Sequence, residues 1–220
     1  MKKFFVLVSL LLFGSAFAAA FYKGFKKLEK GDWSSYVFVS DDGKENRAYY
    51  VYGGKRKVDG KTVEVMELSG DMDGKRMVVQ LWFDKKGEPV KYITRIGNGN
   101  LVCMTKPAIP EDYYRKFTPK EKTPEEFKPE KPDIRYGTYK LPDGREIPVA
   151  IFKTKNGETF VSGEVPFGIV KQVSGGKVVL YLTNFGTGKK LEIPFEEAKM
   201  CKPFTMPSFP GVITPPISIP

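Results

Sequence analysis

The segment Met77-Val78-Val79-Gln80-Leu81-Trp82-Phe83 predicts a β-strand that is apolar on both of its faces. Side chains of a strand point alternately to opposite faces, so the odd-numbered residues share one face and the even-numbered residues the other. All the odd-numbered residues are apolar, and Val78 and Trp82 make the even-numbered face largely apolar as well. A strand with one face in water alternates more strictly between apolar and polar residues. Both faces of this strand are therefore expected to be covered.

Two architectures satisfy this expectation. One is a plain sandwich core in which a helix or the tail of the chain covers the outer face. The other is a strongly curved sheet whose concave face encloses an apolar cavity for a hydrophobic ligand. The pattern of this one strand is compatible with both.

The flanking sequence extends the strand into two antiparallel meanders, over residues 31–105 and 134–200. Asp-Gly, Asn-Gly, Lys-Gly and Gly-Gly pairs separate short runs rich in β-branched and aromatic residues, which is typical of hairpins. The first meander holds the runs 33–40, 47–52, 62–68, 77–83, 90–96 and 101–105. The second holds the runs 138–141, 147–154, 159–165, 169–174, 177–183 and 191–193, followed by a short helix over 194–200.

Residues 106–133 separate the meanders and contain six prolines amid mixed charge, which predicts a partly extended crossover. Residues 203–220 form an apolar, proline-rich tail that we expect to lie across the body or to engage a partner. Helical spacing of apolar residues over 19–30 predicts a short amphipathic helix. The fold class is thus mainly β, with few short helices, in a single β domain over residues 19–202.

The first 18 residues have the pattern of a cleaved signal peptide. Lys2 and Lys3 precede an apolar run, and Ala16-Phe17-Ala18 is a small-x-small cleavage site. The apolar run is short for a membrane anchor, which needs about 20 apolar residues. We expect a periplasmic protein, with an extracellular location as the alternative.

Composition excludes several kinds of chemistry. The 220 residues include no His and 2 Cys, which removes imidazole-dependent nucleophiles, His-ligated zinc and haem, and a four-thiolate metal site. The net charge of +10 comes from lysines dispersed among glutamates, which is typical of a solvated surface rather than of a nucleic-acid interface. We therefore expect no enzyme activity, no metal, no cofactor and no nucleic-acid partner, while peripheral membrane contact stays open.

Cys103 and Cys201 are expected to form one structural disulfide, since an exported protein meets oxidising conditions. A redox-active pair would have the Cys-x-x-Cys spacing, which is absent. The acidic pair Glu64 and Glu67 is compatible with a carboxylate-based hydrolase, although solvated carboxylates of this kind are common. Asp71 and Asp73 have only part of the pattern of a calcium loop and predict a hairpin turn.

Four short motifs together resemble a known family. They are Gly31-Asp-Trp-Ser-Ser-Tyr36, Val58-Asp-Gly-Lys61, Val161-Ser-Gly-Glu-Val-Pro-Phe-Gly-Ile-Val-Lys171 and Leu182-Thr-Asn-Phe-Gly186. In this order they resemble exported bacterial proteins of the LolA/LolB-like, lipoprotein-carrier-like superfamily. The resemblance implies an unclosed antiparallel β-barrel with an apolar interior, and a role in binding lipids or the acyl chains of lipoproteins.

The functional expectation is an exported, non-enzymatic protein that binds a lipid or a lipidated protein in an apolar cavity. The alternative is an envelope protein–protein interaction module without a small ligand, in which the tail and the crossover are docking surfaces. Nine residues are predicted to line the cavity: Met77, Val79, Leu81, Phe83, Tyr92, Val149, Ile151, Phe167 and Ile169.

Overall fold

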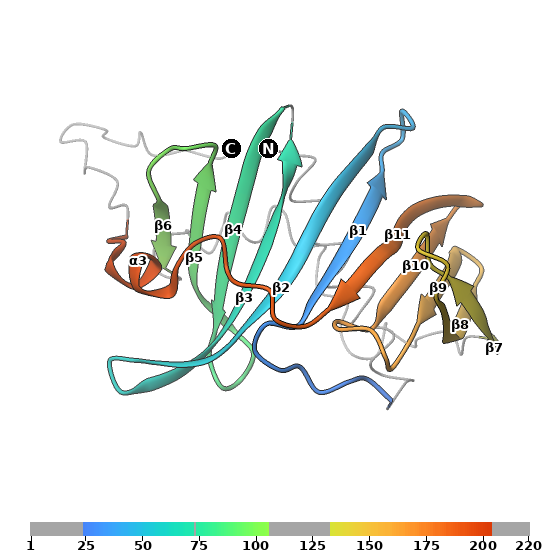
Figure 1. Ribbon diagram of the computed structural model, residues 1–220, viewed down its shortest axis with the longest axis horizontal. Helices are drawn as coiled ribbons and strands as arrows, with labels where there is room; N and C mark the ends of the chain where they lie inside the picture. Colours follow the sequence, from blue (N-terminus) through green and yellow to red (C-terminus); the bar gives the residue numbers. More distant parts are fainter. Residues whose placement is uncertain (1–23, 73, 106–132, 204–220) are drawn as a thin grey trace, which may run out of the picture.

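A computed structural model describes residues 24–72, 74–105 and 133–203, which form one antiparallel sheet of eleven strands and one short helix (Figure 1). The predicted signal peptide, nearly all of the crossover and the tail beyond residue 203 lie outside these residues. The elements are β1 (Trp33–Val39), β2 (Glu45–Val58), β3 (Lys61–Met72), β4 (Lys75–Phe83), β5 (Pro89–Ile96), β6 (Val102–Thr105), β7 (Asp133–Lys140), β8 (Glu146–Thr154), β9 (Gly157–Val161), β10 (Ile169–Ser174), β11 (Lys177–Gly186) and α3 (Phe195–Met200).

The order of strands in the sheet is β6-β5-β4-β3-β2-β1-β11-β10-β9-β8-β7. Each meander forms its own series of hairpins, and the pairing of β1 with β11 joins the two series, with Tyr36 opposite Leu182. The outermost strands, β6 and β7, do not pair with each other, so the sheet is not closed into a barrel. The predicted fold class, a mainly β protein with an unclosed antiparallel sheet, is confirmed.

The second meander is strongly curved. The hydroxyl of Tyr139 in β7 donates a hydrogen bond to the carbonyl oxygen of Leu182 in β11, at 3.1 Å. Three strands lie between β7 and β11, so in a flat sheet the two would be about 19 Å apart. The turn between β7 and β8 also reaches β11, since the Arg145 guanidinium lies 4.9 Å from the centre of the Phe185 ring. The strands from β7 to β11 therefore roll up on themselves.

Two hydrophobic clusters lie against the sheet. The main core takes buried side chains from both meanders, including Tyr36 of β1, Leu68 of β3 and Phe152 of β8. The second cluster lies between the first meander and the chain that follows β11, and it includes Trp82, Ile193 and Ala198. Each side of the first meander thus has its own apolar contacts, as the composition of β4 predicts.

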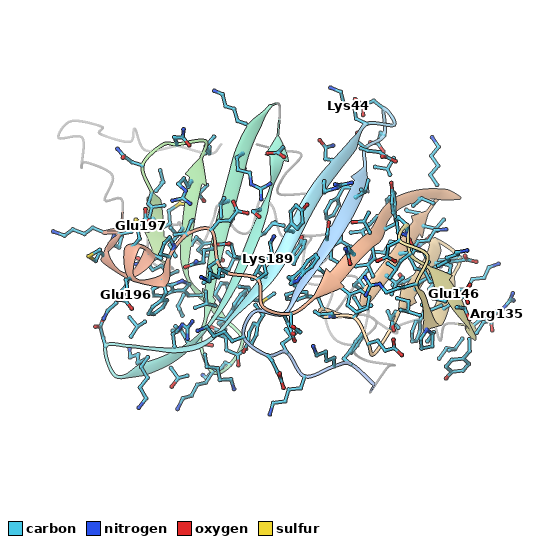
Figure 2. The ribbon with its side chains drawn as sticks, viewed as in Figure 1. Lys44, Arg135, Glu146, Lys189, Glu196 and Glu197 are labelled. Carbon is cyan, nitrogen blue, oxygen red and sulfur yellow. A yellow bond between two sulfur atoms is a disulfide. The ribbon has the colours of Figure 1, made fainter. Side chains whose placement is uncertain are left out.

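The chain that follows β11, residues 187–203, is here called the strap. It runs from β11 across the strands of the first meander and places α3 near β6, at the edge of the sheet (Figure 1). Glu196 and Glu197 of α3 and Arg135 of β7 lie at opposite ends of the molecule (Figure 2). The face of the first meander under the strap, which carries Glu67, Gln80 and Ile93, is here called the strap face.

Two local predictions are wrong and one is confirmed. Residues 191–193 do not form a strand, because side chains of the sheet, rather than a neighbouring strand, bind their backbone groups. Residues 24–29 do not form a helix. The predicted helix over 194–200 is present as α3. In the described residues no helix is both long and apolar enough to cross a bilayer.

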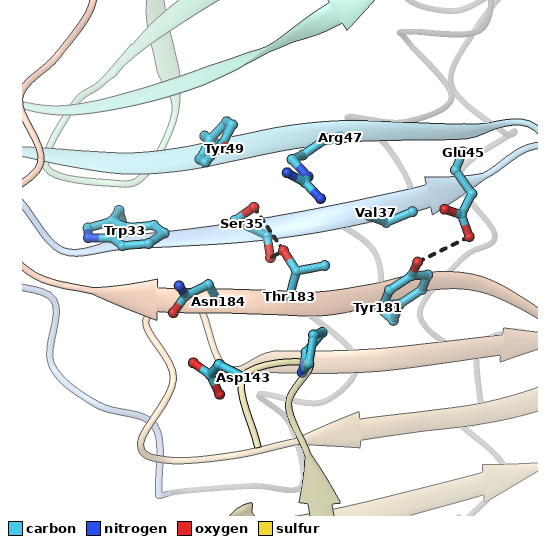
Figure 3. A pocket seen from close by; sticks show the side chains of 11 residues that line it. Trp33, Ser35, Val37, Glu45, Arg47, Tyr49, Asp143, Tyr181, Thr183 and Asn184 are labelled. Carbon is cyan, nitrogen blue, oxygen red and sulfur yellow. Dashed lines mark hydrogen bonds between the residues drawn. The ribbon is translucent and has the colours of Figure 1, made fainter. Parts of the chain in front are cut away.

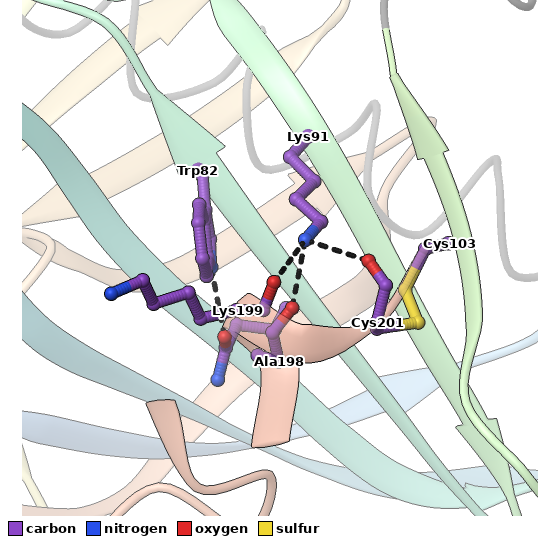
Figure 4. The surroundings of a disulfide bond; sticks show 7 residues. Trp82, Lys91, Cys103, Ala198, Lys199 and Cys201 are labelled. Carbon is purple, nitrogen blue, oxygen red and sulfur yellow. Dashed lines mark hydrogen bonds between the residues drawn. A yellow bond between two sulfur atoms is a disulfide. The ribbon is translucent and has the colours of Figure 1, made fainter. Parts of the chain in front are cut away.

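Cys103 of β6 and Cys201 of the strap form the predicted disulfide (Figure 4). Beside it, the Lys91 ammonium donates hydrogen bonds to the carbonyl oxygens of Ala198 (2.8 Å) and Cys201 (3.0 Å) and lies 4.8 Å from the centre of the Trp82 ring. Burial lowers the pKa of Lys91. The cysteines are 98 residues apart in sequence, so the bridge stabilises the fold by about 4–5 kcal/mol if it acts on chain entropy alone.

Glu67 of β3 is a buried carboxylate that holds the strap to the sheet. Its Oε1 accepts the backbone N–H of Glu192 at 2.6 Å, and its Oε2 accepts that of Ile193 at 3.0 Å. The Gln80 amide donates to the same Oε2 (3.3 Å) and to the carbonyl oxygen of Ile193 (2.9 Å), and the Trp82 indole donates to Gln80 (2.8 Å). Burial raises the pKa of Glu67, while these hydrogen bonds act to lower it.

The variant Glu67→Gln is predicted to destabilise the protein. A glutamine has one acceptor oxygen, so its amide nitrogen would face a backbone N–H of the strap, which costs about 1–3 kcal/mol. Urea unfolding at neutral pH measures this loss, and an unchanged midpoint would contradict the assigned role of Glu67.

The same pair of proteins tests the raised pKa of Glu67. A raised pKa means that the folded protein holds the proton of Glu67 more tightly than the unfolded chain does. The stability that this proton contributes is complete below the ordinary glutamate pKa, and it is lost as the pH rises through the raised pKa of the folded protein. The stability advantage of the wild type over Glu67→Gln should therefore shrink as the pH rises through that window. An advantage that grows over the same window would show that the hydrogen bonds outweigh burial.

Candidate functional site

Five of the nine predicted lining residues lie together on the side of the first meander that faces away from the strap. They are Met77, Val79, Leu81, Phe83 and Tyr92. We call this side of β3–β6 the apolar face, and it also includes Met66 and Met104. The structure thus shows that the two faces of β4 differ: the strap covers one, and the other continues into the main core.

Strand register places four residues of the apolar face in one row. Leu81 lies opposite Met66 on one side and opposite Tyr92 on the other, and Tyr92 lies opposite Met104. All four side chains are half-buried. We call Met66, Leu81, Tyr92 and Met104 the apolar row.

Exposure of the apolar face increases toward the outer edge of the sheet. Val79 belongs to the buried main core, and Met77 and Leu81 pack against that core. Near the edge, Ile96 of β5 is 52% exposed and Val102 of β6 is 51% exposed. The face is therefore anchored at one end by a packed core and is accessible at the other.

The other four predicted residues lie in the second meander. Val149 and Ile169 are fully buried members of the main core, and Ile151 is partly buried against it. The Phe167 ring lies 5.8 Å from that of Tyr50. Val149, Ile151 and Ile169 lie in or against the main core, to which Leu81 of the apolar row also packs, but none of the four residues is part of that row. The part of the prediction that the structure brings together is thus the group on β4 and β5.

Two of the motifs that carry the family resemblance meet in one corner of the fold. The Ser34 hydroxyl of β1 donates to the carbonyl oxygen of Pro166 at 2.7 Å, and the Tyr36 hydroxyl donates to that of Ile169 at 3.0 Å. Burial raises the pKa of Tyr36 far above its ordinary value, so the phenol stays a neutral donor. The observed contacts of both motifs are structural, because they fix the loop before β10 onto β1.

Gly168 in this loop has a φ of +73°, and a Cβ added to it would lie 2.1 Å from a ring carbon of Phe25. Gly144 has a φ of +89° with open space around the same position. We predict that Gly144→Ala costs about 1–2 kcal/mol, the penalty of the left-handed backbone alone. Gly168→Ala should cost about 1.5–3 kcal/mol more, because it expels the Phe25 ring from its packed position.

Urea unfolding of the two alanine variants measures this difference. Equal losses would show that Phe25 moves aside without cost and that the loop corner is less tightly packed than its contacts indicate.

The acidic pair considered for hydrolysis is not brought together. Glu64 and Glu67 are three residues apart in one strand, so they lie on opposite faces. Glu64 forms an ion pair with Lys55 at 3.1 Å, whereas both oxygens of Glu67 bind the strap. Within the described ranges, no three His, Cys, Asp or Glu side chains are grouped so that they could hold a metal ion.

Sequence reasoning missed a hollow on the side of β1, β2 and β11 that faces away from the main core. This hollow has a volume of about 570 Å³ (Figure 3). Its lining residues are Trp33, Ser35, Val37, Glu45, Arg47, Tyr49, Pro142, Asp143, Tyr181, Thr183 and Asn184. It includes none of the nine predicted residues. The sequence signal for this hollow was the alternation of Trp33, Ser35 and Val37, which places them on one face of the first strand. Their partners on β11 lie about 150 residues away in sequence, so the sequence alone did not bring them together.

No family model matches the chain, and no curated protein matches it in sequence. Two solved structures are similar in outline. The crystal structure of MucB in complex with MucA(peri) has a TM-score of 0.41 and 12% identity, over 79% of this chain and 55% of that one. The crystal structure of MucB has a TM-score of 0.40 and 16% identity, over 84% of this chain and 60% of that one. The chain spans less than two thirds of each MucB chain, and these values do not establish a family for it.

Proposed function

We propose that this is an exported, non-enzymatic protein that binds the acyl chain of a lipid or of a lipidated protein on its apolar face. The observation that carries the proposal is the apolar row, four half-buried side chains in register on four adjacent strands. Three strand spacings give the row a length of about 14 Å, which suits an extended hydrocarbon chain.

The chemistry of the face favours a flexible apolar ligand. Met66, Met77 and Met104 all lie on it, and methionine side chains adapt to ligands of varied shape. Each methylene group that leaves water for such a surface contributes about 0.8 kcal/mol. Among the described residues, the one helix and the strap lie on the opposite face and leave this side of the sheet to the ligand.

Export fits the same proposal. The disulfide between Cys103 and Cys201 is stable in an oxidising compartment, and the N-terminal pattern predicts a cleaved signal peptide. A periplasmic location would place the apolar face where lipids and lipoproteins must be shielded from water.

A protein partner without a small ligand is the second candidate. In the described part of the chain β7 is an edge strand, paired only with β8, and on it Tyr136 is 81% exposed and Ile134 is 38% exposed. Edges of this kind accept an extended peptide as an additional strand. If Tyr136→Glu loses a protein partner but still binds the acyl chain, the result would favour a protein partner at the edge strand β7.

The lipid proposal is tested by titrating the protein with a fluorescent fatty acid and with a diacylated lipopeptide in competition. Saturable binding is expected in the wild type. Tyr92→Glu, which places a charge in the middle of the apolar row, should weaken binding at least about tenfold, since burying an unpaired carboxylate is costly. The matched control Tyr136→Glu makes the same change at the edge strand and should bind as the wild type does.

The thermal unfolding of both variants must be measured in parallel, so that a misfolded Tyr92→Glu is recognised. The milder Tyr92→Ser, which removes the ring without adding charge, should lose part of the affinity. Absence of saturable binding in the wild type, or equal binding by all variants, would overturn the proposal.

A further inference from the structure

We propose that the hollow on β1, β2 and β11 is a second binding site, and that it takes a carboxylate-bearing sugar unit of a glycan. The site is independent of the apolar face, from which it differs in position and chemistry. Its volume of about 570 Å³ lies in the range of small-molecule sites. The floor is the face of β1 that carries Ser35, β2 and β11 flank it, and the turn between β7 and β8 closes one side (Figure 3).

An aromatic platform occupies one end of the hollow. The rings of Trp33 and Tyr49 lie side by side, with their centres 6.5 Å apart and their planes at 43°. The Lys189 ammonium of the strap lies 5.5 Å from the first ring centre and 4.5 Å from the second, which fixes both rings in place. The Arg76 guanidinium also lies 5.7 Å from the centre of the Tyr49 ring, so the ring surface that would pack against the apolar face of a sugar is the part that these two cations leave uncovered.

Arg47 provides the anion site. Its side chain projects from β2 into the hollow, between the aromatic platform and Tyr181 (Figure 3). Within the described residues its guanidinium forms no hydrogen bond and no ion pair, and it is exposed. A planar guanidinium binds a carboxylate through two parallel hydrogen bonds. Of the other nearby cations, Arg145 pairs with Asp143 and Arg76 with Glu192, while Lys189 lies over the rings of the aromatic platform.

The remaining polar groups suit hydroxyl groups, which both donate and accept. Glu45 accepts a hydrogen bond from Tyr181 at 3.1 Å and has further acceptor capacity. The Thr183 hydroxyl donates to Ser35, and Asn184 lies at the rim. An acyl chain would use neither the Arg47 guanidinium nor the remaining acceptor capacity of Glu45, and a chain of phosphates would meet the negative charges of Glu45 and Asp143. A sugar with one carboxylate satisfies both the guanidinium and the acceptors.

Calorimetric titration of the full protein tests the proposal with three probes: a tetragalacturonate, an N-acetylmuramic-acid disaccharide and the neutral cellotetraose. Saturable binding of at least one acidic probe, tighter than that of cellotetraose, is expected. The two acidic probes distinguish a uronic-acid polymer from a cell-wall glycan as the source of the carboxylate. Heat from neither acidic probe, or equal affinity for cellotetraose, would overturn the proposal.

Arg47→Gln should weaken binding of the acidic probe at least about tenfold, because the charge-assisted pair is lost. It should leave the fold intact, since the side chain is exposed. The matched control Arg135→Gln removes one positive charge from β7 at the far end of the sheet and should bind as the wild type does (Figure 2). Equal losses in the two variants would indicate general charge attraction rather than this site and would overturn the assignment. Fatty-acid binding by Arg47→Gln should be unchanged, so failure of one site is distinguishable from failure of the other.

Discussion

The buried carboxylate of Glu67 is the interaction on which the two-sided arrangement of the sheet depends. A charge in the interior must be matched by donors, and here these are two backbone N–H groups of the strap and the Gln80 amide. These bonds hold residues 192–193 over the face of β3. The disulfide then fixes the end of the strap to β6. Among the described residues one face of the first meander is thereby covered by the strap, and the apolar face lies on its other side.

β1 is the strand at which the two meanders meet. It pairs with β2 and with β11, so it belongs to both meanders. On one face Ser34 and Tyr36 anchor the loop before β10 and lead into the main core. On the other face Trp33 and Ser35 form part of the hollow. Alternation along a single strand thus places the residues that pack into the core on one face and the residues of the proposed binding site on the other.

Much of the fold could be predicted from the sequence, because hairpin turns and strand composition are local signals. The Asp-Gly and Asn-Gly pairs placed most strands correctly, and the cysteines gave the disulfide once export was assumed. The segment 191–193 could not be recognised as strap, because its backbone groups are bound by side chains of β3–β5 that are about 100 residues earlier in the chain. The helix expected before Trp33 depended on a periodicity that long-range packing overrode, since Phe25 packs against Gly168.

The candidate sites show the same limit. The alternation of residues within β4 and β5 correctly placed Met77, Leu81 and Tyr92 on one face. Val149 and Ile169 follow the same alternation, but they are buried in the main core because the second meander rolls up around them. The hollow needs β1 beside β11 and the turn at Asp143 beside Asn184, and no local pattern encodes either neighbour.

The central claim, that an acyl chain lies on the apolar face, is tested most directly by methyl NMR of methionine-labelled protein with a spin-labelled fatty acid. Met66, Met77 and Met104 lie on that face, whereas Met200 lies on α3 and is 74% exposed, which makes it an internal control. We expect the spin label to broaden the methyl signals of the first three residues and to leave that of Met200 unchanged. Broadening of Met200 alone, or of none of the four, would contradict it.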